Sequence, residues 1–351
     1  MRRALAGLEP GGFSGVQFVS PRRGWVVGVD QILSTADGGA RWIVQDRGGL
    51  ELTSVDFVSA RRGWAAGASS LLATSDGGRR WRILPEVCPL IRAVHFVSAS
   101  AGFAVAGGTG ISLDGGAAPE TGGVVLATSD GGQSWRQLAA PADAQSVCFN
   151  DSVSGWLGAG GRLYRTTDGG RSWILTTAGV TPARPADPAT MIVQCAGAAS
   201  AWALDTGPGA AMSQMPHIGY HASPASTIPV FAEQYFPHPG VTVLAQSPGS
   251  YAGPLSALSA SAAVYIDYCP ACGYGTAPWD LATSGGASLT RRGNVGDLNW
   301  PVAASFLTPE LGWVTGFEVD SRNPSRPRLY PRIVATSDGG RTWHIDYAAS
   351  P

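Results

Sequence analysis

The chain repeats one turn motif in a fixed frame, and this repeat limits its fold more than any other feature. The pattern T-x-D-G-G-x-x-W occurs five times, with its aspartate at Asp37, Asp76, Asp130, Asp168 and Asp338. Successive aspartates are 39, 54, 38 and 170 residues apart, so one unit occupies about 40 residues and the last interval has room for two diverged units. Self-similarity at such a period predicts an array of supersecondary units.

Each unit has the pattern of short β-strands. Apolar and polar residues alternate with a period of two, β-branched and aromatic residues are frequent, and glycine turns separate the runs, which predicts four strands and no helix per unit. Four strands in about 40 residues are typical of a β-propeller blade. Units that carry the motif lie at about 13–45, 52–84, 91–139, 144–177 and 298–347, and diverged units lie at about 189–247 and 255–294.

These units predict an all-β protein, a single seven-bladed β-propeller of four-stranded antiparallel blades. The propeller would span residues 13–347 after an N-terminal tail at 1–12, and six or eight blades are the alternatives. Ten of the twelve tryptophans are in register with the repeat. We therefore assign a structural role to the motif aspartates and to the tryptophans that close each motif: Trp42, Trp81, Trp135, Trp173 and Trp343.

The motif resembles the Asp-box, or bacterial neuraminidase repeat (BNR), and the preceding F-V-S-x-x-x-G-W resembles the photosystem II assembly and stability factor family. The similarity covers most of residues 13–177 and 301–347 and fails over about 180–295. It implies a non-catalytic scaffold or assembly factor that binds a protein or peptide. It also favours an extracytoplasmic or secreted location, although no signal peptide is visible. The same architecture serves sialidases and other glycoside hydrolases, so fold does not imply activity.

Composition excludes several classes of partner. The formal net charge is −1, and all 24 basic residues are arginine. This charge balance provides no broad attraction for nucleic acid or anionic membrane, and no stretch has the length and hydrophobicity of a membrane span. We expect no nucleic-acid partner, no membrane insertion, no cofactor and a monomeric chain.

Extra length collects between the second and third strands of four blades, at about Gly107–Gly123, Gly207–Ser226, Cys269–Trp279 and Val319–Pro331. These segments would share one face, and long loops on a rigid scaffold often bind partners. The candidate binding residues are His217, Tyr220, His221, Glu233, Tyr235, Tyr274, Trp279, Arg322, Arg326 and Arg328. The alternative function is a carbohydrate-active propeller, sialidase-like, another glycoside hydrolase or glycan-binding, for which Asp114, Glu120, Glu233 and Asp280 are the plausible carboxylates.

The histidines and cysteines suggest no catalytic or metal site. His217 and His221 have the spacing of a helical metal pair, but Gly219 argues against a helix there, so we expect no metal. Cys269 and Cys272 have the C-x-x-C spacing without the βαβ context of a redox motif, and we predict a local disulfide between them. Cys148 and Cys195 are predicted to be small buried hydrophobic residues.

Overall fold

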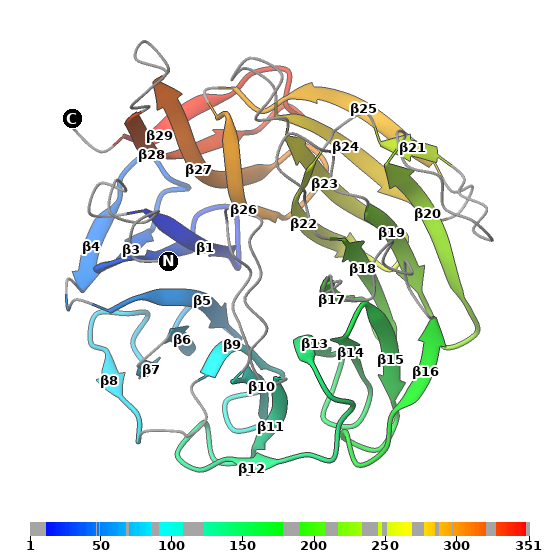
Figure 1. Cartoon of the computed structure of the whole chain (residues 1–351). Coiled ribbons are helices and arrows are strands. Elements are labelled where there is room, and N and C mark those ends of the chain that lie inside the picture. The colour runs from blue at the N-terminus through cyan, green and yellow to red at the C-terminus, as the bar shows by residue number, and fades with distance from the viewer. Residues whose placement is uncertain are drawn as a thin grey trace.

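The structure is a closed ring of seven β-sheets around a central axis (Figure 1). This computed structural model describes residues 12–348 except 47, 49, 68–69, 86–90, 108–122, 178–189, 208–216, 234–244, 248–250, 269–276, 285–287, 297 and 321–327. The prediction of an all-β propeller with seven antiparallel, four-stranded blades is confirmed. Among the described residues, no helix is long and apolar enough to cross a membrane.

Each blade uses consecutive strands, with the first strand nearest the axis. The strands of blades one to three are β1 (Phe13–Phe18), β2 (Gly24–Gly28), β3 (Gln31–Thr35) and β4 (Ile43–Asp46); β5 (Leu52–Phe57), β6 (Gly63–Gly67), β7 (Ser70–Thr74) and β8 (Arg82–Ile83); β9 (Ile91–Phe96), β10 (Gly102–Ala106), β11 (Val124–Thr128) and β12 (Arg136–Gln137). Those of blades four and five are β13 (Ala144–Phe149), β14 (Gly155–Ala159), β15 (Arg162–Thr166) and β16 (Ile174–Thr177); β17 (Thr190–Ala196), β18 (Ser200–Thr206), β19 (His217–Ala222), β20 (Thr227–Glu233) and β21 (Ala245–Ser247). Those of blades six and seven are β22 (Tyr251–Ser259), β23 (Ala262–Tyr268), β24 (Pro278–Thr283) and β25 (Ser288–Asn294); β26 (Trp300–Phe306), β27 (Gly312–Asp320), β28 (Arg328–Thr336) and β29 (His344–Ala348).

Blade five departs from the four-stranded pattern. Its short β21 adds to the outer strand β20 in a parallel pairing, which makes this sheet five-stranded. The chain thereby covers the outer edge of β20, and a covered edge cannot pair with another molecule.

A stacked pair of aromatic rings joins blades one to four to one another and blade seven to blade one. The phenylalanine that ends the first strand of one blade lies flat against a ring from the second strand of the preceding blade. The pairs are Trp25–Phe57, Trp64–Phe96 and Trp313–Phe18, each with centroids 3.5 Å apart, and Phe103–Phe149 at 3.3 Å. The motif tryptophan of the same blade meets this phenylalanine edge-on, as Trp81 meets Phe57 at 5.9 Å. Stacked and edge-on contacts are the favoured arrangements of aromatic pairs.

The same phenylalanine explains the glycine that begins the second strand, which precedes tryptophan in four of these blades and Phe103 in blade three. A Cβ on Gly63 would lie 2.4 Å from the Phe57 ring, and Gly24, Gly102, Gly155 and Gly312 have equivalent contacts. The indole N–H of the following tryptophan reaches the next blade, where Trp64 Nε1 donates to the carbonyl of Gly131 at 2.9 Å. The G-W dipeptide therefore makes room for one ring and supplies another.

The Asp-box turn is held by its own side chains. In the third blade, Thr128 Oγ1 donates to Asp130 Oδ1 at 2.8 Å, and Asp130 Oδ1 accepts the backbone N–H of Ser134 at 2.9 Å. Gly131 and Gly132 both have positive φ, a conformation that glycine adopts at little cost. Hydrogen bonds from Ser134 and Thr128 lower the pKa of Asp130 to about 2. The turn thus satisfies its backbone locally, and the other four boxes share the bond from threonine to aspartate.

A belt of side-chain links surrounds the axis at the level of the first strands. Each border is crossed by the residue that precedes the phenylalanine position of one blade. This residue contacts the main chain or side chain of the residue at the phenylalanine position of the next blade. Six links are hydrogen bonds: Gln17 to Phe57, Asp56 to Phe96, His95 to Phe149, Gln194 to Ala257, Ser256 to Phe306 and Ser305 to Phe18. The seventh is a disulfide between Cys148 and Cys195. Because the inner strands are sheet edges, these links satisfy backbone groups that would otherwise lack a partner.

The ring closes between blades seven and one without a shared strand. Phe18 stacks on Trp313, Ser305 Oγ accepts the N–H of Phe18 at 2.9 Å, and Trp313 Nε1 donates to the carbonyl of Gly38 at 2.9 Å. Closure therefore uses the same contacts as the borders among blades one to four, and its strength depends on side-chain packing.

One residue makes the closing border chemically different. After four of the five motif tryptophans, the third residue packs on the second box glycine of the next blade: Gln45 on Gly78, Leu84 on Gly132, Leu138 on Gly170 and Asp346 on Gly39. The Asp346 side chain is 3% exposed, and burial raises its pKa to about 6 even though the nearby His344 favours its charged form. Its Oδ1 lies 3.1 Å from Nε2 of His344, which is 60% exposed, and Asp37 adds a repulsive negative charge. A carboxylate at this border therefore opposes closure at neutral pH.

We predict that Gly63→Ala lowers the free energy of unfolding by about 2–3 kcal/mol, because the new methyl group must displace the Phe57 ring from Trp25. Urea unfolding followed by tryptophan fluorescence measures the change. Gly48→Ala is the matched control, because its Cβ would meet nothing closer than Asp46 Oδ1 at 3.2 Å. Equal effects of the two substitutions would contradict the packing argument.

We predict that Asp346→Asn raises the thermal midpoint by about 2–5 °C at pH 8 and changes it little at pH 4.5. The folded-state pKa of about 6 exceeds the ordinary value of 3.8, so this carboxyl group favours folding when protonated, and its contribution is lost as the pH rises through 6. Thermal unfolding between pH 4.5 and 8 measures the effect. The mirror variant Gln45→Glu should lower the midpoint more at pH 8 than at pH 4.5. A lower midpoint for Asp346→Asn at pH 8 would disprove the assignment.

Candidate functional site

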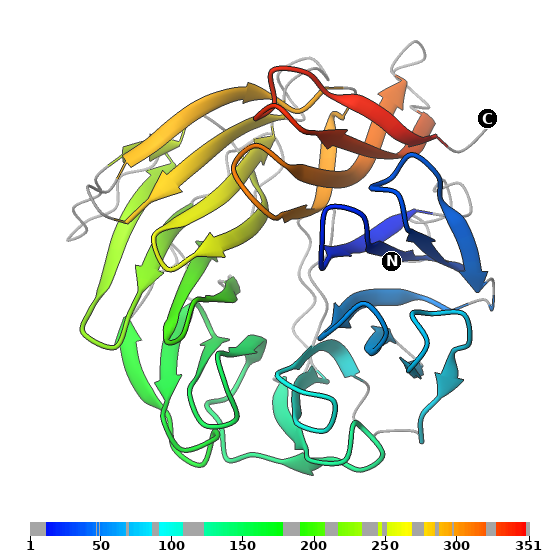
Figure 2. The ribbon, with the colours of Figure 1, turned by 180° about the vertical axis from the view of Figure 1, so that it is seen from behind.

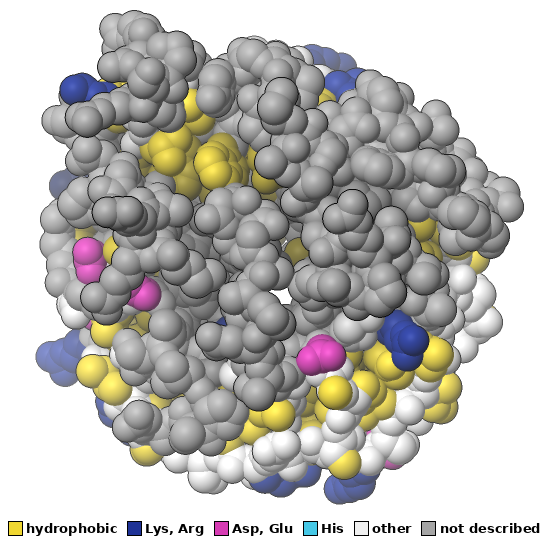
Figure 3. Space-filling model, viewed as in Figure 1, with side chains coloured by type: hydrophobic (Ala, Val, Ile, Leu, Met, Phe, Trp, Pro, Cys, Tyr) yellow, Lys and Arg dark blue, Asp and Glu magenta, His cyan; other side chains and the backbone are white. Residues whose placement is uncertain are grey.

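Two faces of the ring differ in what they present. The Asp-box hairpins and the turns between first and second strands lie on one face, seen in Figure 2, and the ends of second strands lie on the other. The described residues on either side of the four long segments, such as Gly107 and Val124 in blade three, belong to this second face, which Figure 3 shows. We call it the strand 2–3 face.

The structure places the histidine-rich stretch of blade five in a strand and not in a loop. His217, Tyr220 and His221 all belong to β19, so the predicted insertion at 207–226 extends too far. His217 and Tyr220 are buried at 0% and 3% exposure. His221 contacts the ring of Trp202 at 5.1 Å, and burial lowers its pKa. His217 and Tyr220 therefore lie in the interior, and His221 is partly buried at its edge.

The remaining predicted binding residues are divided between strands and undescribed segments. Trp279 lies in β24, fully buried, and its ring packs on Phe306 of blade seven at 5.5 Å, so it is a core residue and not a loop aromatic. Arg328 begins β28 and is exposed. Glu233 ends β20. Tyr235, Tyr274, Arg322 and Arg326 lie outside the described residues, as do Asp114 and Glu120.

A cluster of buried polar side chains lies between blades five and six near the strand 2–3 face. His217 Nε2 lies 3.7 Å from Asp267 Oδ1, and both side chains are fully buried. The Tyr265 ring lies 5.6 Å from that of His217, and burial together with the Asp267 charge raises the pKa of Tyr265. Perturbed groups of this kind occur at functional sites and in structural networks alike.

Asp280 extends this group toward the outer strand of blade six. It pairs with Tyr265 across β23 and β24, and its Oδ1 accepts a hydrogen bond from Arg291 Nε at 3.2 Å. Burial raises the pKa of Asp280 to about 6, Arg291 opposes this rise, and the nearby Asp267 adds to it. Asp267 and Asp280 are thus neighbouring carboxyl groups, but their exposures of 0% and 2% place them inside the sheet packing.

The strand 2–3 face also carries partly exposed aromatic side chains at the border of blades six and seven. Tyr268 ends β23, and its ring lies 6.3 Å from Trp300 at the start of β26. The ring of Trp300 in turn lies 6.4 Å from that of Phe317 of β27, which is buried beneath it. Hydrophobic side chains are visible over β26 and β27 in Figure 3. Aromatic residues of this kind are enriched at protein interfaces.

The opposite face carries exposed arginines in the first two blades. Arg22 and Arg23 follow β1, and Arg61 occupies the equivalent turn of blade two. Arg62 has a structural contact, because its guanidinium lies over Trp64 at 5.2 Å and donates to the carbonyl of Ala99 at 3.3 Å.

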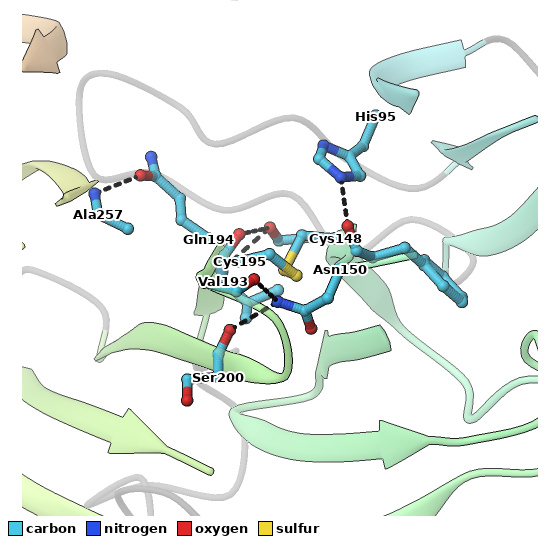
Figure 4. Close-up of a disulfide and its surroundings, with 11 residues drawn as sticks. His95, Cys148, Asn150, Val193, Gln194, Cys195, Ser200 and Ala257 are labelled. Carbon is cyan, nitrogen blue, oxygen red and sulfur yellow. Dashed lines mark hydrogen bonds between the residues drawn. A yellow bond between two sulfur atoms is a disulfide. The ribbon is translucent and has the colours of Figure 1, made fainter. Parts of the chain in front are cut away.

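The cysteine prediction was wrong for one pair. Cys148 and Cys195 form a disulfide between β13 and β17, with Cα atoms 5.5 Å apart, and are not independent hydrophobic residues (Figure 4). They occupy neighbouring positions on the first strands of adjacent blades, and this register was the available signal. Cys269 and Cys272 lie outside the described residues. Within the described part of the chain, no group of three or more His, Cys, Asp or Glu side chains is arranged to hold a metal ion.

Sequence reasoning did not identify the group formed by His217, Tyr265 and Asp267. These residues come from β19 and β23, about 50 positions apart, and the repeat that defines the other blades is lost in this part of the chain. The one available signal was polar residues at inward positions of predicted strands.

The comparison with known protein families finds a match over the first two repeats. Residues 11–86 match the family described as photosynthesis system II assembly factor YCF48. No curated protein sequence matches the chain. Among solved structures, the GH74 enzyme of Niastella koreensis superposes with a TM-score of 0.58 and 11% identity, over 96% of this chain and 66% of that one. An ancestral GH74 enzyme has a TM-score of 0.56 and 11% identity, over 96% of this chain and 54% of that one, so the chain spans only part of both GH74 enzymes.

Two further solved structures extend the comparison. Oligogalacturonate lyase from Vibrio parahaemolyticus has a TM-score of 0.55 and 10% identity, over 95% of this chain and 91% of that one. YCF48 from Cyanidioschyzon merolae has a TM-score of 0.49 and 14% identity, over 84% of each chain. At such identities, structural likeness to the enzymes shows the fold alone. The chain is a BNR-type β-propeller whose residues 11–86 match the YCF48 family of photosynthesis system II assembly factors.

Proposed function

We propose that this protein is a non-catalytic scaffold that binds a protein or peptide through its strand 2–3 face. The observation that carries the proposal is the pair of partly exposed aromatic side chains Tyr268 and Trp300 at the border of blades six and seven, with Trp300 packed on the buried Phe317. A rigid propeller face with partly exposed aromatic side chains provides contact area at a low cost in conformational entropy. The match of blades one and two to an assembly-factor family supports the same class of function.

Charged residues near this aromatic group favour recognition over catalysis. Arg332 Nη2 lies 2.8 Å from Glu318 Oε2, and its guanidinium lies over the Tyr330 ring at 5.5 Å. Arg328 starts the same strand and is exposed. Exposed arginine and a carboxylate already paired with arginine are typical of a polar recognition surface.

The alternative is a glycoside hydrolase, and one observation favours it. Asp280 has a pKa raised to about 6 and lies near Asp267, which resembles the tuned carboxyl pairs of such enzymes. Burial of both groups and the bond from Arg291 to Asp280 argue against access by a sugar chain. We therefore assign this pair to the interior packing of blades five and six.

Substitutions on the two faces of the ring test the proposal. We expect Arg328→Glu and Trp300→Ala to reduce capture of the binding partner from source cells at least tenfold, because both alter the strand 2–3 face. Chemical cross-linking and mass spectrometry of the captured protein provide the measurement. The matched controls Arg23→Glu and Arg61→Glu alter exposed arginines on the opposite face and should leave capture unchanged.

Other results would redirect the assignment. Loss of capture only in Arg23→Glu and Arg61→Glu would place the binding surface on the Asp-box face. Hydrolysis of an oligosaccharide panel by the wild type and its loss in Asp280→Asn would contradict the non-catalytic proposal. Circular dichroism confirms that each variant remains folded.

A further inference from the structure

We infer that the Cys148–Cys195 disulfide makes the junction of blades four and five dependent on oxidation, and that the chain folds where disulfide oxidants are supplied. This junction differs from its neighbours in sequence. Cys195 stands where blades one to four and blade seven have phenylalanine, so Trp156 has no phenylalanine there on which to stack. Among the described residues, no stacked ring pair joins blade four to blade five.

The disulfide occupies the level of the belt at which the other six borders have hydrogen bonds. In Figure 4, His95 on one side bonds to the carbonyl of Phe149 at 2.8 Å, and Gln194 on the other accepts the N–H of Ala257 at 2.9 Å. The covalent bond between these two contacts joins strands whose cysteines are 47 residues apart. It therefore closes a long loop and constrains the unfolded chain as well as the folded junction.

The surroundings of the bond are apolar. Cys148 is 3% exposed and packs in one cluster with Trp156, Leu163 and Met191, and Cys195 packs against the same cluster. Asn150 Nδ2 donates to the carbonyls of Gly197 and Ser200 at 3.0 Å and adds a polar link between the same blades. If the bond is reduced, the junction is held by this cluster and by two hydrogen bonds, from the N–H of Met191 to Gln145 and from the N–H of Val193 to Ser146. In the part of the chain that the structure describes, no stacked ring adds to these contacts.

The chemistry is thiol–disulfide exchange. A thiolate of one cysteine attacks an oxidant disulfide, R–S–S–R, and releases one R–SH; the second cysteine then attacks the mixed disulfide, forms the Cys148–Cys195 bond and releases a second R–SH. Two electrons and two protons pass from the cysteines to the oxidant. The oxidant class is a disulfide-bonded thiol oxidoreductase or oxidised glutathione, and such oxidants are available in oxidising compartments. Because Cys148 is buried in the folded ring, the exchange must precede or accompany the docking of blade five on blade four.

Thermal unfolding with and without the reductant TCEP tests the inference on the full chain. We expect TCEP to lower the midpoint of the wild type by about 5–10 °C. The variant C148A/C195A should unfold near the reduced wild type and be insensitive to TCEP. The matched control C269A/C272A removes the other cysteine pair and should keep the full sensitivity. A TCEP effect that survives in C148A/C195A, or that disappears in C269A/C272A, would overturn the assignment.

Two measurements on the wild type avoid any dependence on the folding of variants. Peptide mapping of the unreduced protein should recover the Cys148 peptide linked to the Cys195 peptide, and recovery of both as free alkylated thiols would refute the bond. Hydrogen exchange should be faster after reduction in β13 and β17 and unchanged in β5 and β6. An equal change in all blades would show that the bond supports the whole ring and does not control one junction.

Discussion

The contact between a first-strand phenylalanine and a second-strand ring of the preceding blade is the interaction on which the ring depends. A single four-stranded sheet has two faces to bury and an inner edge with unpaired backbone groups. Stacking such as that of Trp64 on Phe96 covers the faces, and the belt of side chains near the axis satisfies the edges. The stacking joins blades one to four and closes the ring between blades seven and one, and the belt crosses all seven borders, so the arrangement is complete only when the ring closes.

Blades five and six show what happens when the repeat is lost. The phenylalanine of blade five is replaced by Cys195, and a disulfide provides the missing link. In blade six the ring that packs on the next blade comes from Trp279 of the third strand. Between these blades, His217, Tyr265 and Asp267 place polar groups in the interior. Each junction has its own solution, so the diverged sector keeps the geometry of the ring with different chemistry.

The two faces of the propeller differ in how strongly the turn chemistry constrains their sequence. Asp-box turns use their side chains to hold their own backbone, and the five boxes of this chain share the same residues at these positions. The ends of second strands carry no such constraint, and there the chain has its long segments and partly exposed aromatic groups such as Tyr268 and Trp300. A rigid ring therefore presents one face on which sequence can change without loss of the fold.

The sequence alone determined the blade architecture, because the period of the repeat and the chemistry of the D-G-G turn are local properties. Glycine, aspartate and tryptophan at set spacings specify a hairpin wherever they occur, and five copies in one frame specify a ring. Only the tertiary structure decided which residues meet across blades: it buried His217 and Trp279, which had been expected to bind a partner, and it joined Cys148 to Cys195. It also showed Asp346 at the closing border, where other blades have glutamine or leucine. Such neighbours depend on strand register and on how adjacent sheets pack, and no local pattern encodes contacts between residues so far apart in the chain.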